Sequence, residues 1–176
     1  DLSFLRSSIG MVPQETFLFS ATVKENIAFG FPDAGEDAIF KAAALSTIDR
    51  DLRDFPAGYE TEVGERGITL SGGQKQRIAI SRAILVNPEI LVFDDALSAV
   101  DAETEASILS EFLEKRKGRT AILISQRIST LDQTDKVIVL EGGRISQQGP
   151  PSQLMQGPGL YRDISRLQLI EKEADL

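Results

Sequence analysis

Two segments of the sequence combine residue types that can hold a phosphate and a metal ion. Residues 70–77 read LSGGQKQR and place Gly72 and Gly73 at the predicted start of a helix. Unpaired N–H groups and the helix dipole make such a start a seat for an anion. Residues 90–94 read ILVFD, a short buried strand that ends on the carboxylate of Asp94. A carboxylate at the end of a parallel strand can hold a magnesium ion through water, so the two segments together predict a nucleotide site.

The glycines of the first segment need an explanation of their own. Ser71 and Gln74 alone could form a capping box, in which each side chain satisfies the backbone N–H of the other residue. That alternative leaves Gly72 and Gly73 unexplained, because glycine in a first turn costs up to about 1 kcal/mol relative to alanine. Close approach of an anion to the backbone explains both glycines, and we favour it.

The adjacent carboxylates of Asp94 and Asp95 also have a plain alternative, since acidic residues after a strand are commonly turn residues or helix N-caps. Here they follow a four-residue apolar run, residues 90–93, which predicts a position at the carboxyl edge of a parallel sheet. Proteins of the α/β class bind ligands at this edge. We therefore expect both side chains to face a ligand.

Composition excludes several classes of protein and of site. The chain has 176 residues, of which 41% are hydrophobic and 26% charged, as in ordinary globular proteins. Its net charge of −8 argues against nucleic acid as the main partner. The absence of cysteine excludes disulfides, and the absence of histidine leaves acid–base chemistry to carboxylates. No apolar run is long enough to span a membrane.

The hydrophobic pattern predicts an alternation of strands and helices. A helical region is expected over 21–52, broken at 31–35, and a turn at 141–143 is expected to join two late strands. Strands are predicted at 8–12, 90–93, 121–124 and 137–140, and helices at 71–86 and 102–117. In the last of these helices, the stripe Ala102, Ala106, Leu109 and Leu113 is expected to pack on the sheet. This order is typical of an α/β fold with a parallel sheet and crossover helices.

The segments at 70–77 and 90–94 resemble, almost letter for letter, the signature motif and the Walker B strand of the ATP-binding cassette (ABC) family. The resemblance covers essentially all 176 residues. It implies a partial RecA-type parallel-sheet core with an inserted α-helical subdomain that carries the signature. Within an incomplete nucleotide-binding domain spanning 1–176, the implied parts are a Q-loop strand region (1–20), the helical signature subdomain (21–86), a core with Walker B, D-loop and switch (87–150), and a helical tail (151–176).

The resemblance assigns the signature residues to a cofactor-binding role. Ser71, Gly72, Gly73 and Gln74 are expected to reach across a dimer to the γ-phosphate of ATP held by the other subunit. Asp101, in the D-loop, is expected to face the nucleotide and also to be the N-cap of the following helix.

The resemblance also assigns the metal and the attacking water. Asp94 is expected to hold Mg²⁺, and Gln14, in the Q-loop, to meet both the magnesium ion and the water. In the family a glutamate that polarises the water follows the Walker B aspartate, whereas this chain has Asp95. The carboxylate of Asp95 lies one C–C bond, about 1.5 Å, further back. We expect a misplacement of that size to slow hydrolysis on the order of a hundredfold.

A second departure concerns the switch residue, which is usually histidine in the family and is Gln126 here. Glutamine can donate a hydrogen bond to a phosphate oxygen, but it cannot carry a proton. Since Asp95 and Gln126 are both expected near the γ-phosphate, the site of this chain is predicted to bind ATP better than it hydrolyses it.

Two further segments favour the exporter branch of the family. Residues 22–27 read TVKENI, and residues 61–67 read TEVGERG, which resembles the x-loop of exporters with Glu62 facing the coupling helices of a transmembrane domain. No G-x-x-x-x-G-K-S/T occurs in these residues, so we expect the chain to be the C-terminal part of a nucleotide-binding domain. Without the upstream strands the fragment is expected to be marginal, swapped or associated.

The function implied is an ABC-type ATPase domain that uses ATP and Mg²⁺ to drive an exporter. Its expected partners are a second nucleotide-binding domain, in a heterodimer, and a transmembrane domain contacted through the Q-loop and x-loop. The expected location is the cytoplasmic face of the cell membrane, and the isolated fragment is expected to be inactive. The alternative is a non-catalytic nucleotide-sensing or interaction module of the same fold, which a damaged signature would have favoured. A soluble ABC ATPase of the translation or chromosome type has less support, because those relatives do not use the x-loop.

Overall fold

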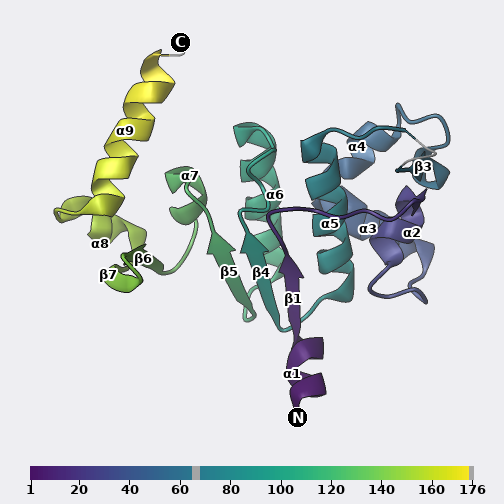
Figure 1. Cartoon of the computed structure of the whole chain (residues 1–176), viewed down its shortest axis with the longest axis horizontal. Coiled ribbons are helices and arrows are strands. Elements are labelled where there is room, and N and C mark those ends of the chain that lie inside the picture. Colours follow the sequence, from purple (N-terminus) through teal and green to yellow (C-terminus); the bar gives the residue numbers. More distant parts are fainter. Residues whose placement is uncertain (65–67, 175–176) are drawn as a thin grey trace. The chain divides into compact units, whose positions relative to one another are not determined.

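The computed structural model describes residues 1–64 and 68–174 of the chain. It divides into two compact units, Asp1–Ile124 and Ser125–Leu176, and each is described by itself (Figure 1). Helices and strands alternate along most of the chain, which confirms the predicted α/β class. Within the described residues, no helix has both the length and the apolar character needed to cross a membrane.

The first unit is built on a three-stranded parallel sheet in the order β1-β4-β5. Its strands are β1 (Ile9–Val12), β4 (Ile90–Asp94) and β5 (Thr120–Ile124). Each of the three corresponding predicted strands is confirmed to within one residue at either end. Since β4 lies between its two neighbours, the carboxyl ends of all three strands meet at one edge of the sheet.

One face of this sheet is covered by the two helices that flank β4 in sequence, α5 (Gly72–Val86) and α6 (Ala102–Lys115) (Figure 1). Leu91 and Phe93 point to this side and are buried, and the Phe93 ring meets the Phe112 ring of α6 edge to face at 5.1 Å. The core on this face also contains Val12, Ala79, Ile80, Ile108 and Leu109.

The predicted stripe of α6 is confirmed at Leu109 and Leu113, which lie in and against the core, and is wrong at Ala102 and Ala106, which are exposed. The buried face carries Glu105, Ile108 and Phe112 beside Leu109. Isoleucine and phenylalanine remove far more apolar area from water than alanine does, so the large side chains decide which face turns inward.

The other face of the sheet leaves apolar side chains exposed. Met11 of β1, Val92 of β4 and Ile122 of β5 lie in one row across the strands. Met11 and Ile122 are exposed, as are Ile9 and Ile124 on the same face. Parallel sheets are normally covered on both faces, so this face lacks the layer that such a sheet requires.

The region between β1 and α5 is helical, as predicted, but is split into short pieces. Its elements are β2 (Ala21–Thr22), α2 (Val23–Ala28), α3 (Glu36–Leu45), α4 (Ile48–Leu52), the 3-10 helix η1 (Gly58–Glu60) and β3 (Glu62–Val63). Thr22 and Glu25 form a capping box that starts α2, and β2 pairs with β3 antiparallel. Val23 and Ile27 are buried against Ile78 of α5 in one cluster. A helix α1 (Leu2–Ser8), not predicted from the sequence, precedes β1.

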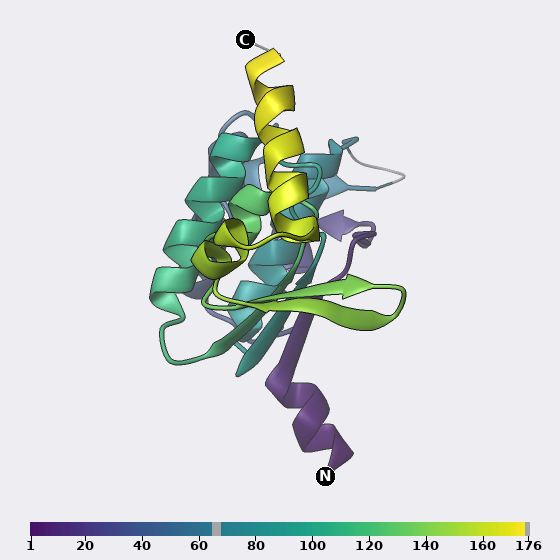
Figure 2. The same cartoon turned by 90° about the vertical axis from the view of Figure 1, so that its left-hand side faces the viewer.

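The described part of the second unit, residues 125–174, forms a hairpin and three helices. Its elements are α7 (Ile128–Leu131), β6 (Val137–Glu141), β7 (Arg144–Gly149), α8 (Pro151–Gln156) and α9 (Leu160–Ala174). Gly142 and Gly143 have φ of 56° and 76°, the backbone that a two-residue hairpin turn requires, so the predicted turn is confirmed. Figure 2 shows this hairpin in yellow-green and α9 in yellow.

The strand predicted at 137–140 was expected in the parallel core, and this assignment is corrected. The strand forms as β6, but it pairs antiparallel with β7 in a separate two-stranded sheet. The short turn after Glu141 brings β7 back directly alongside, and a tight turn can only join antiparallel neighbours.

We expect the 176-residue chain on its own to self-associate through the open sheet face, because large exposed apolar patches are rare on stable monomers. Met11→Lys combined with Ile122→Lys should shift the chain towards the monomer in multi-angle light scattering. Leu140→Lys, at an exposed position of the second unit, is the matched control and should leave association unchanged. A wild-type chain that stays monomeric throughout would contradict this expectation.

Candidate functional site

The two predicted carboxylates lie where β4 ends. Asp94 is the last residue of β4 and pairs with Ile124 of β5, and Asp95 turns the chain out of the strand with a φ of 49°. Aspartate is one of the few residues besides glycine that adopts this left-handed backbone readily. The Asp95 N–H donates to the carbonyl oxygen of Ile124 at 2.9 Å, which fixes the turn. Both side chains are half-buried at the carboxyl edge of the sheet.

Gln14 lies two residues after β1 and reaches the same edge. Its Nε2 donates to Oδ2 of Asp95 at 3.3 Å, so the structure brings together two residues that are far apart in the sequence. Within the described residues, no three carboxylates form a metal-binding cluster. Magnesium keeps several waters and needs only one or two protein oxygens besides phosphate, so the carboxylate of Asp94 and the amide oxygen of Gln14 fit this ion chemically.

The start of α5 contains the capping box that the sequence left as an alternative. Ser71 Oγ accepts from the Gln74 N–H at 3.2 Å, and Gln74 Oε1 accepts from the Ser71 N–H at 3.0 Å. A Cβ on Gly73 would lie 2.8 Å from the carbonyl oxygen of Ala99, and one on Gly72 would lie 3.3 Å from the Ala99 side chain. Packing within the chain therefore requires glycine at 73, which is a second reason for glycine beside the expected approach of an anion.

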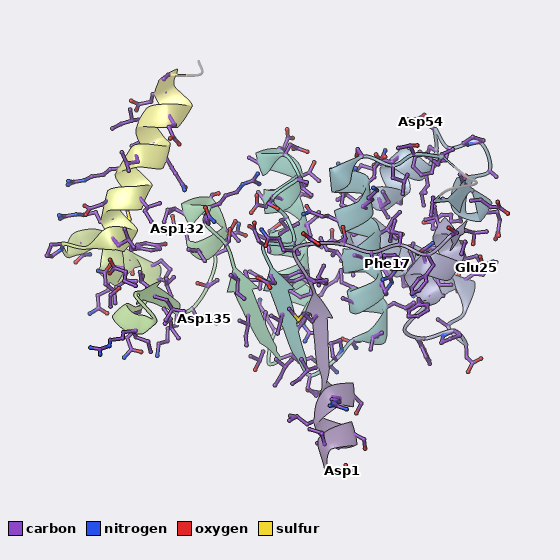
Figure 3. All side chains as sticks on the ribbon, in the orientation of Figure 1. Asp1, Phe17, Glu25, Asp54, Asp132 and Asp135 are labelled. Carbon is purple, nitrogen blue, oxygen red and sulfur yellow. The ribbon has the colours of Figure 1, made fainter. Side chains whose placement is uncertain are left out.

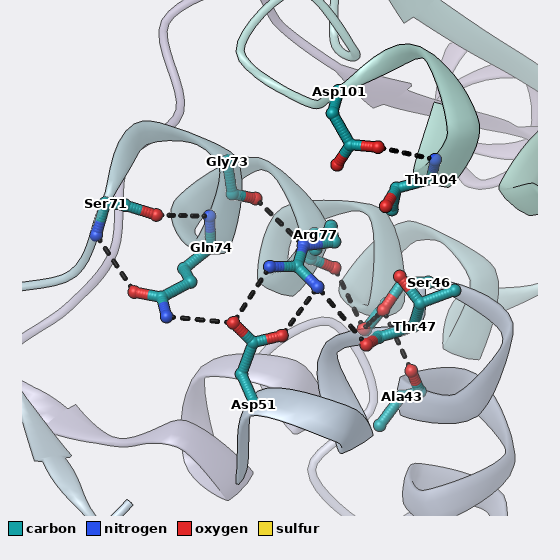
Figure 4. A network of polar contacts seen from close by, with 11 residues as sticks. Ala43, Ser46, Thr47, Asp51, Ser71, Gly73, Gln74, Arg77, Asp101 and Thr104 are labelled. Carbon is teal, nitrogen blue, oxygen red and sulfur yellow. Dashed lines mark hydrogen bonds and ion pairs between the residues drawn. The ribbon is translucent and has the colours of Figure 1, made fainter. Parts of the chain in front are cut away.

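Asp51 of α4 joins the first two turns of α5 to the helical region (Figure 4). The Arg77 guanidinium grips its carboxylate with Nη1 at 2.6 Å and Nη2 at 3.0 Å, and Gln74 Nε2 donates to it at 2.9 Å. Arg77 Nη1 also donates to the carbonyl oxygen of Thr47 at 3.2 Å. One carboxylate thus holds the side chains of both Gln74 and Arg77. Sequence analysis did not find Asp51, because its partners lie 23 and 26 positions away without a pattern that connects them.

The pKa of Asp51 reports the balance in this network. Burial acts to raise the pKa, but the hydrogen bonds from Arg77 and Gln74 and the charge of Arg77 outweigh it, so the pKa lies below its ordinary value. The charged form is therefore the one that the folded structure stabilises.

Gln76 links α5 to the loop that follows Asp95. Its side chain is 5% exposed, its Oε1 accepts from the Ala99 N–H at 2.9 Å, and its Nε2 donates to Ser98 Oγ at 3.3 Å. Ser98 Oγ in turn donates to the Asp95 carbonyl oxygen at 2.8 Å. Gln76 lies on the same helical face as the buried Ile80, and a polar residue on an apolar face is the one sequence signal that pointed to it.

The other predicted residues take the following places. Asp101 Oδ1 accepts from the Thr104 N–H at 2.9 Å, so its predicted N-cap role is confirmed. Gln126 belongs to the second unit, where it is exposed and its carbonyl oxygen accepts from Gln168 Nε2 at 2.7 Å. Glu62 is exposed on β3, and residues 65–67 of the predicted x-loop lie outside the described residues.

A cluster of aromatic rings lies between the Q-loop segment and the helical region. The Phe19 ring meets Phe17 edge to face at 5.1 Å and stacks on Phe29 at 4.1 Å, and the Arg82 guanidinium lies over Phe19 and Phe29. Phe17, whose side chain is labelled in Figure 3, is 67% exposed. Phe29 is 55% exposed. Exposed aromatic side chains gathered in one place are typical of an interaction surface.

Comparison with known proteins places these features in a family. The model of the ABC transporter family matches residues 1–98. The chain is 47% identical over 173 residues to the probable multidrug resistance ABC transporter ATP-binding/permease protein YheI of Bacillus subtilis (strain 168), covering 98% of this chain and 30% of that protein. It is 49% identical over 170 residues to the multidrug resistance-like ATP-binding protein MdlA of Escherichia coli (strain K12), covering 97% of this chain and 29% of that protein.

A solved structure of a bacterial Atm1-family ABC exporter with ATP bound resembles this chain with a TM-score of 0.90 and 42% sequence identity. The match covers 96% of this chain and 30% of that one. The chain thus spans about 30% of the length of these relatives.

Asp51→Asn should destabilise the chain by about 1–3 kcal/mol at neutral pH, because it removes the charge that pairs with the part-buried Arg77. Since the folded-state pKa is lowered, the contribution is present above the unfolded-state pKa of about 3.9 and is lost as the pH falls through the lower folded value. The deficit of the variant in urea unfolding should therefore shrink as the pH is lowered from 7 to 3. Asp54→Asn, at an exposed position, is the control. A deficit that stays constant with pH would contradict this assignment.

Proposed function

This chain belongs to the ABC transporter family, and from that premise we propose that it is the ATP-binding and hydrolysis-coupling part of the nucleotide-binding domain of an exporter. The observation that carries the proposal is the meeting of Gln14 and Asp95 at the carboxyl end of β4, next to Asp94. Relatives named as multidrug ATP-binding/permease proteins and the likeness to an exporter with ATP bound support the exporter assignment.

In this proposal Asp94 and Gln14 hold Mg²⁺, which would neutralise charge on the phosphates of ATP. Gln14 and Asp95 orient the attacking water, and Gln126 donates a hydrogen bond to the γ-phosphate. The hydrogen bond from Gln14 to Asp95 supports the shared role of these two side chains.

The chain's own site is proposed to hydrolyse ATP poorly. The Asp95 side chain is one methylene shorter than glutamate, and its backbone is held by the hydrogen bond from the Asp95 N–H to the Ile124 carbonyl oxygen. Moving the carboxylate closer to an attacking water would require that hydrogen bond to break. Gln126 has no titratable group to replace a histidine. Both departures affect the same step, the polarisation of water and of the γ-phosphate, and they leave ATP binding intact.

The start of α5 is proposed to complete the ATP site of a second, different nucleotide-binding domain. Ser71 and Gly72 are exposed, which leaves the helix start open to an anionic ligand. Asp101 follows Val100, whose Cα lies 3.9 Å from a Cβ built on Gly73, and Asp101 is proposed to face the same nucleotide. The division of labour would make this chain necessary for hydrolysis that its partner performs.

A transmembrane domain is the second proposed partner. The exposed Glu62 and the exposed ring of Phe17 would contact it, which would hold this domain at the cytoplasmic face of the cell membrane. Glu62 supplies a negative charge, and the rings of Phe17 and Phe29 supply exposed apolar area. Protein interfaces commonly combine the two.

The 176-residue chain alone should bind ATP with Mg²⁺ more weakly than micromolar and should not hydrolyse it. A glycine-rich phosphate loop with its lysine supplies most phosphate contacts in such sites, and these residues contain none. Isothermal calorimetry with the chain, and with the full-length protein as the comparison, measures this. Micromolar affinity in the chain alone would contradict the proposed dependence on that loop.

The division of labour predicts an asymmetric response in the full-length heterodimer. Asp95→Ala should change total ATP turnover little, and Asp95→Glu should raise turnover at this site only modestly while Gln126 remains. Gly73→Asp should abolish most turnover, since it places a negative charge against the γ-phosphate in the partner's site.

Gly73→Ala is the matched control for this experiment, because any Cβ at 73 meets the Ala99 carbonyl oxygen. The loss seen with alanine measures that steric part, and the additional loss with aspartate measures the charge. If Gly73→Asp were no worse than Gly73→Ala while Asp95→Ala removed turnover, this chain would own the working site and the proposal would be reversed.

A further inference from the structure

One side chain of α9 bridges the two peptide groups that follow Gln126 in the chain. Gln168 Nε2 donates to the carbonyl oxygen of Gln126 at 2.7 Å, and Gln168 Oε1 accepts from the Ile128 N–H at 3.0 Å. All three residues belong to the second unit. A single amide thus fixes the two peptide groups that flank Arg127.

The Ile128 N–H is one that the helix itself cannot satisfy. Ile128 is the first residue of α7, and its N-cap, Arg127, makes no side-chain capping bond. The first N–H groups of a helix have no partner within the helix. Gln168 therefore supplies the cap of α7 from another helix, 40 positions later in the sequence.

A second contact sets the position of α9 along α7. Tyr161 is 2% exposed, and its hydroxyl donates to Asp132 Oδ1 at 2.7 Å directly after α7 ends. Burial and the hydrogen bond to Asp132 both raise the pKa of Tyr161, so this contact does not titrate near neutral pH. Tyr161 and Gln168 are two turns apart on α9. Gln168 is hydrogen-bonded to the start of the short helix α7, and Tyr161 to the residue that follows its end.

The position of Gln168 on its helix supports a specific role. It shares the inward face of α9 with Tyr161 and Ile164, both of which pack in the core of this unit. A polar side chain on such a face is costly unless it is hydrogen-bonded, and both ends of this amide are. Both of its hydrogen bonds go to the backbone of residues 126–128.

We propose that Gln168 is a positioning residue for Gln126: it sets the backbone from which Gln126 reaches the γ-phosphate of ATP, and so makes α9 part of the nucleotide switch. The functional half of this statement rests on the function proposed above. The structural half does not, because it concerns the backbone of residues 126–128 with or without nucleotide.

The structural half is tested by hydrogen exchange on the full-length protein. Gln168→Leu should make the amide of Ile128 exchange roughly fivefold faster, the change expected for one net hydrogen bond. Gln168→Glu keeps an acceptor for Ile128 but has no donor for the Gln126 carbonyl oxygen, so it should preserve the protection of Ile128. Gln148→Leu, at an exposed position of β7, is the control. Unchanged exchange in Gln168→Leu overturns the proposal whatever the ATPase activity is.

The functional half is tested by photolabelling this subunit with 8-azido-ATP and Mg²⁺ in the full-length heterodimer. Gln168→Leu, Gln168→Glu and Gln126→Ala should each reduce labelling by a similar factor, roughly three- to tenfold. Because Gln168 acts through Gln126, the double variant Gln168→Leu with Gln126→Ala should be no worse than Gln126→Ala alone.

The outcomes separate the two proposals. Additive losses in the double variant, or normal labelling in both Gln168 variants beside a loss in Gln126→Ala, overturn positioning of Gln126 by Gln168. Normal labelling in Gln126→Ala overturns instead the role proposed for Gln126 at the phosphate, and the exchange experiment then decides the positioning alone.

Discussion

The parallel ladder that holds β4 between β1 and β5 is the constraint on which the candidate site depends. Hydrogen bonding along both edges of β4 leaves its carboxyl end flush with those of its neighbours. Gln14 lies two residues after β1, and Asp95 lies directly after β4. Their side chains therefore meet at this edge, and a hydrogen bond joins them. The carbonyl oxygen of Ile124, at the end of the third strand, takes the Asp95 N–H and turns the chain away from the sheet.

After that turn the chain passes alongside α5. There the contacts are made by side-chain amides and charged groups and no longer by the strand ladder. Gln76 holds the returning loop from one side of α5, and Asp51 holds the first turns of the same helix from the other. A buried or part-buried polar side chain stabilises a structure only when it is hydrogen-bonded, and both the Gln76 amide and the Asp51 carboxylate are. The start of α5 is thus fixed to the sheet edge and to the helical region at once.

The sheet could be predicted from the sequence because its strands are short apolar runs beside residues that interrupt regular structure, such as Pro13 after β1 and Pro88 before β4. The face of α6 could not, because a count of apolar positions gives Ala106 the same weight as Phe112, although their buried areas differ greatly. The turn after β6 was predicted, but the sheet to which β6 belongs was not, since periodicity reveals a strand but not the sheet that it joins.

The side chains that organise the site show a different limit. Gln76 and Gln168 each lie on the apolar face of a helix, which signals that a polar partner must exist. Periodicity says nothing about which backbone group that partner is, because the contact is made across tens of residues. Asp51 carried no such signal at all, as an acidic residue on a short helix is usually solvated.

The contact between Gly73 and Ala99 has a consequence for how this sequence can change over time. Substitutions accumulate at a position once its function is lost, unless the fold itself forbids them. At 73 the fold forbids them, because a side chain of any size would push the loop that carries Ala99 away from α5. Purifying selection on packing would therefore keep glycine at 73 in relatives whose helix start still binds nucleotide and in relatives where it no longer does.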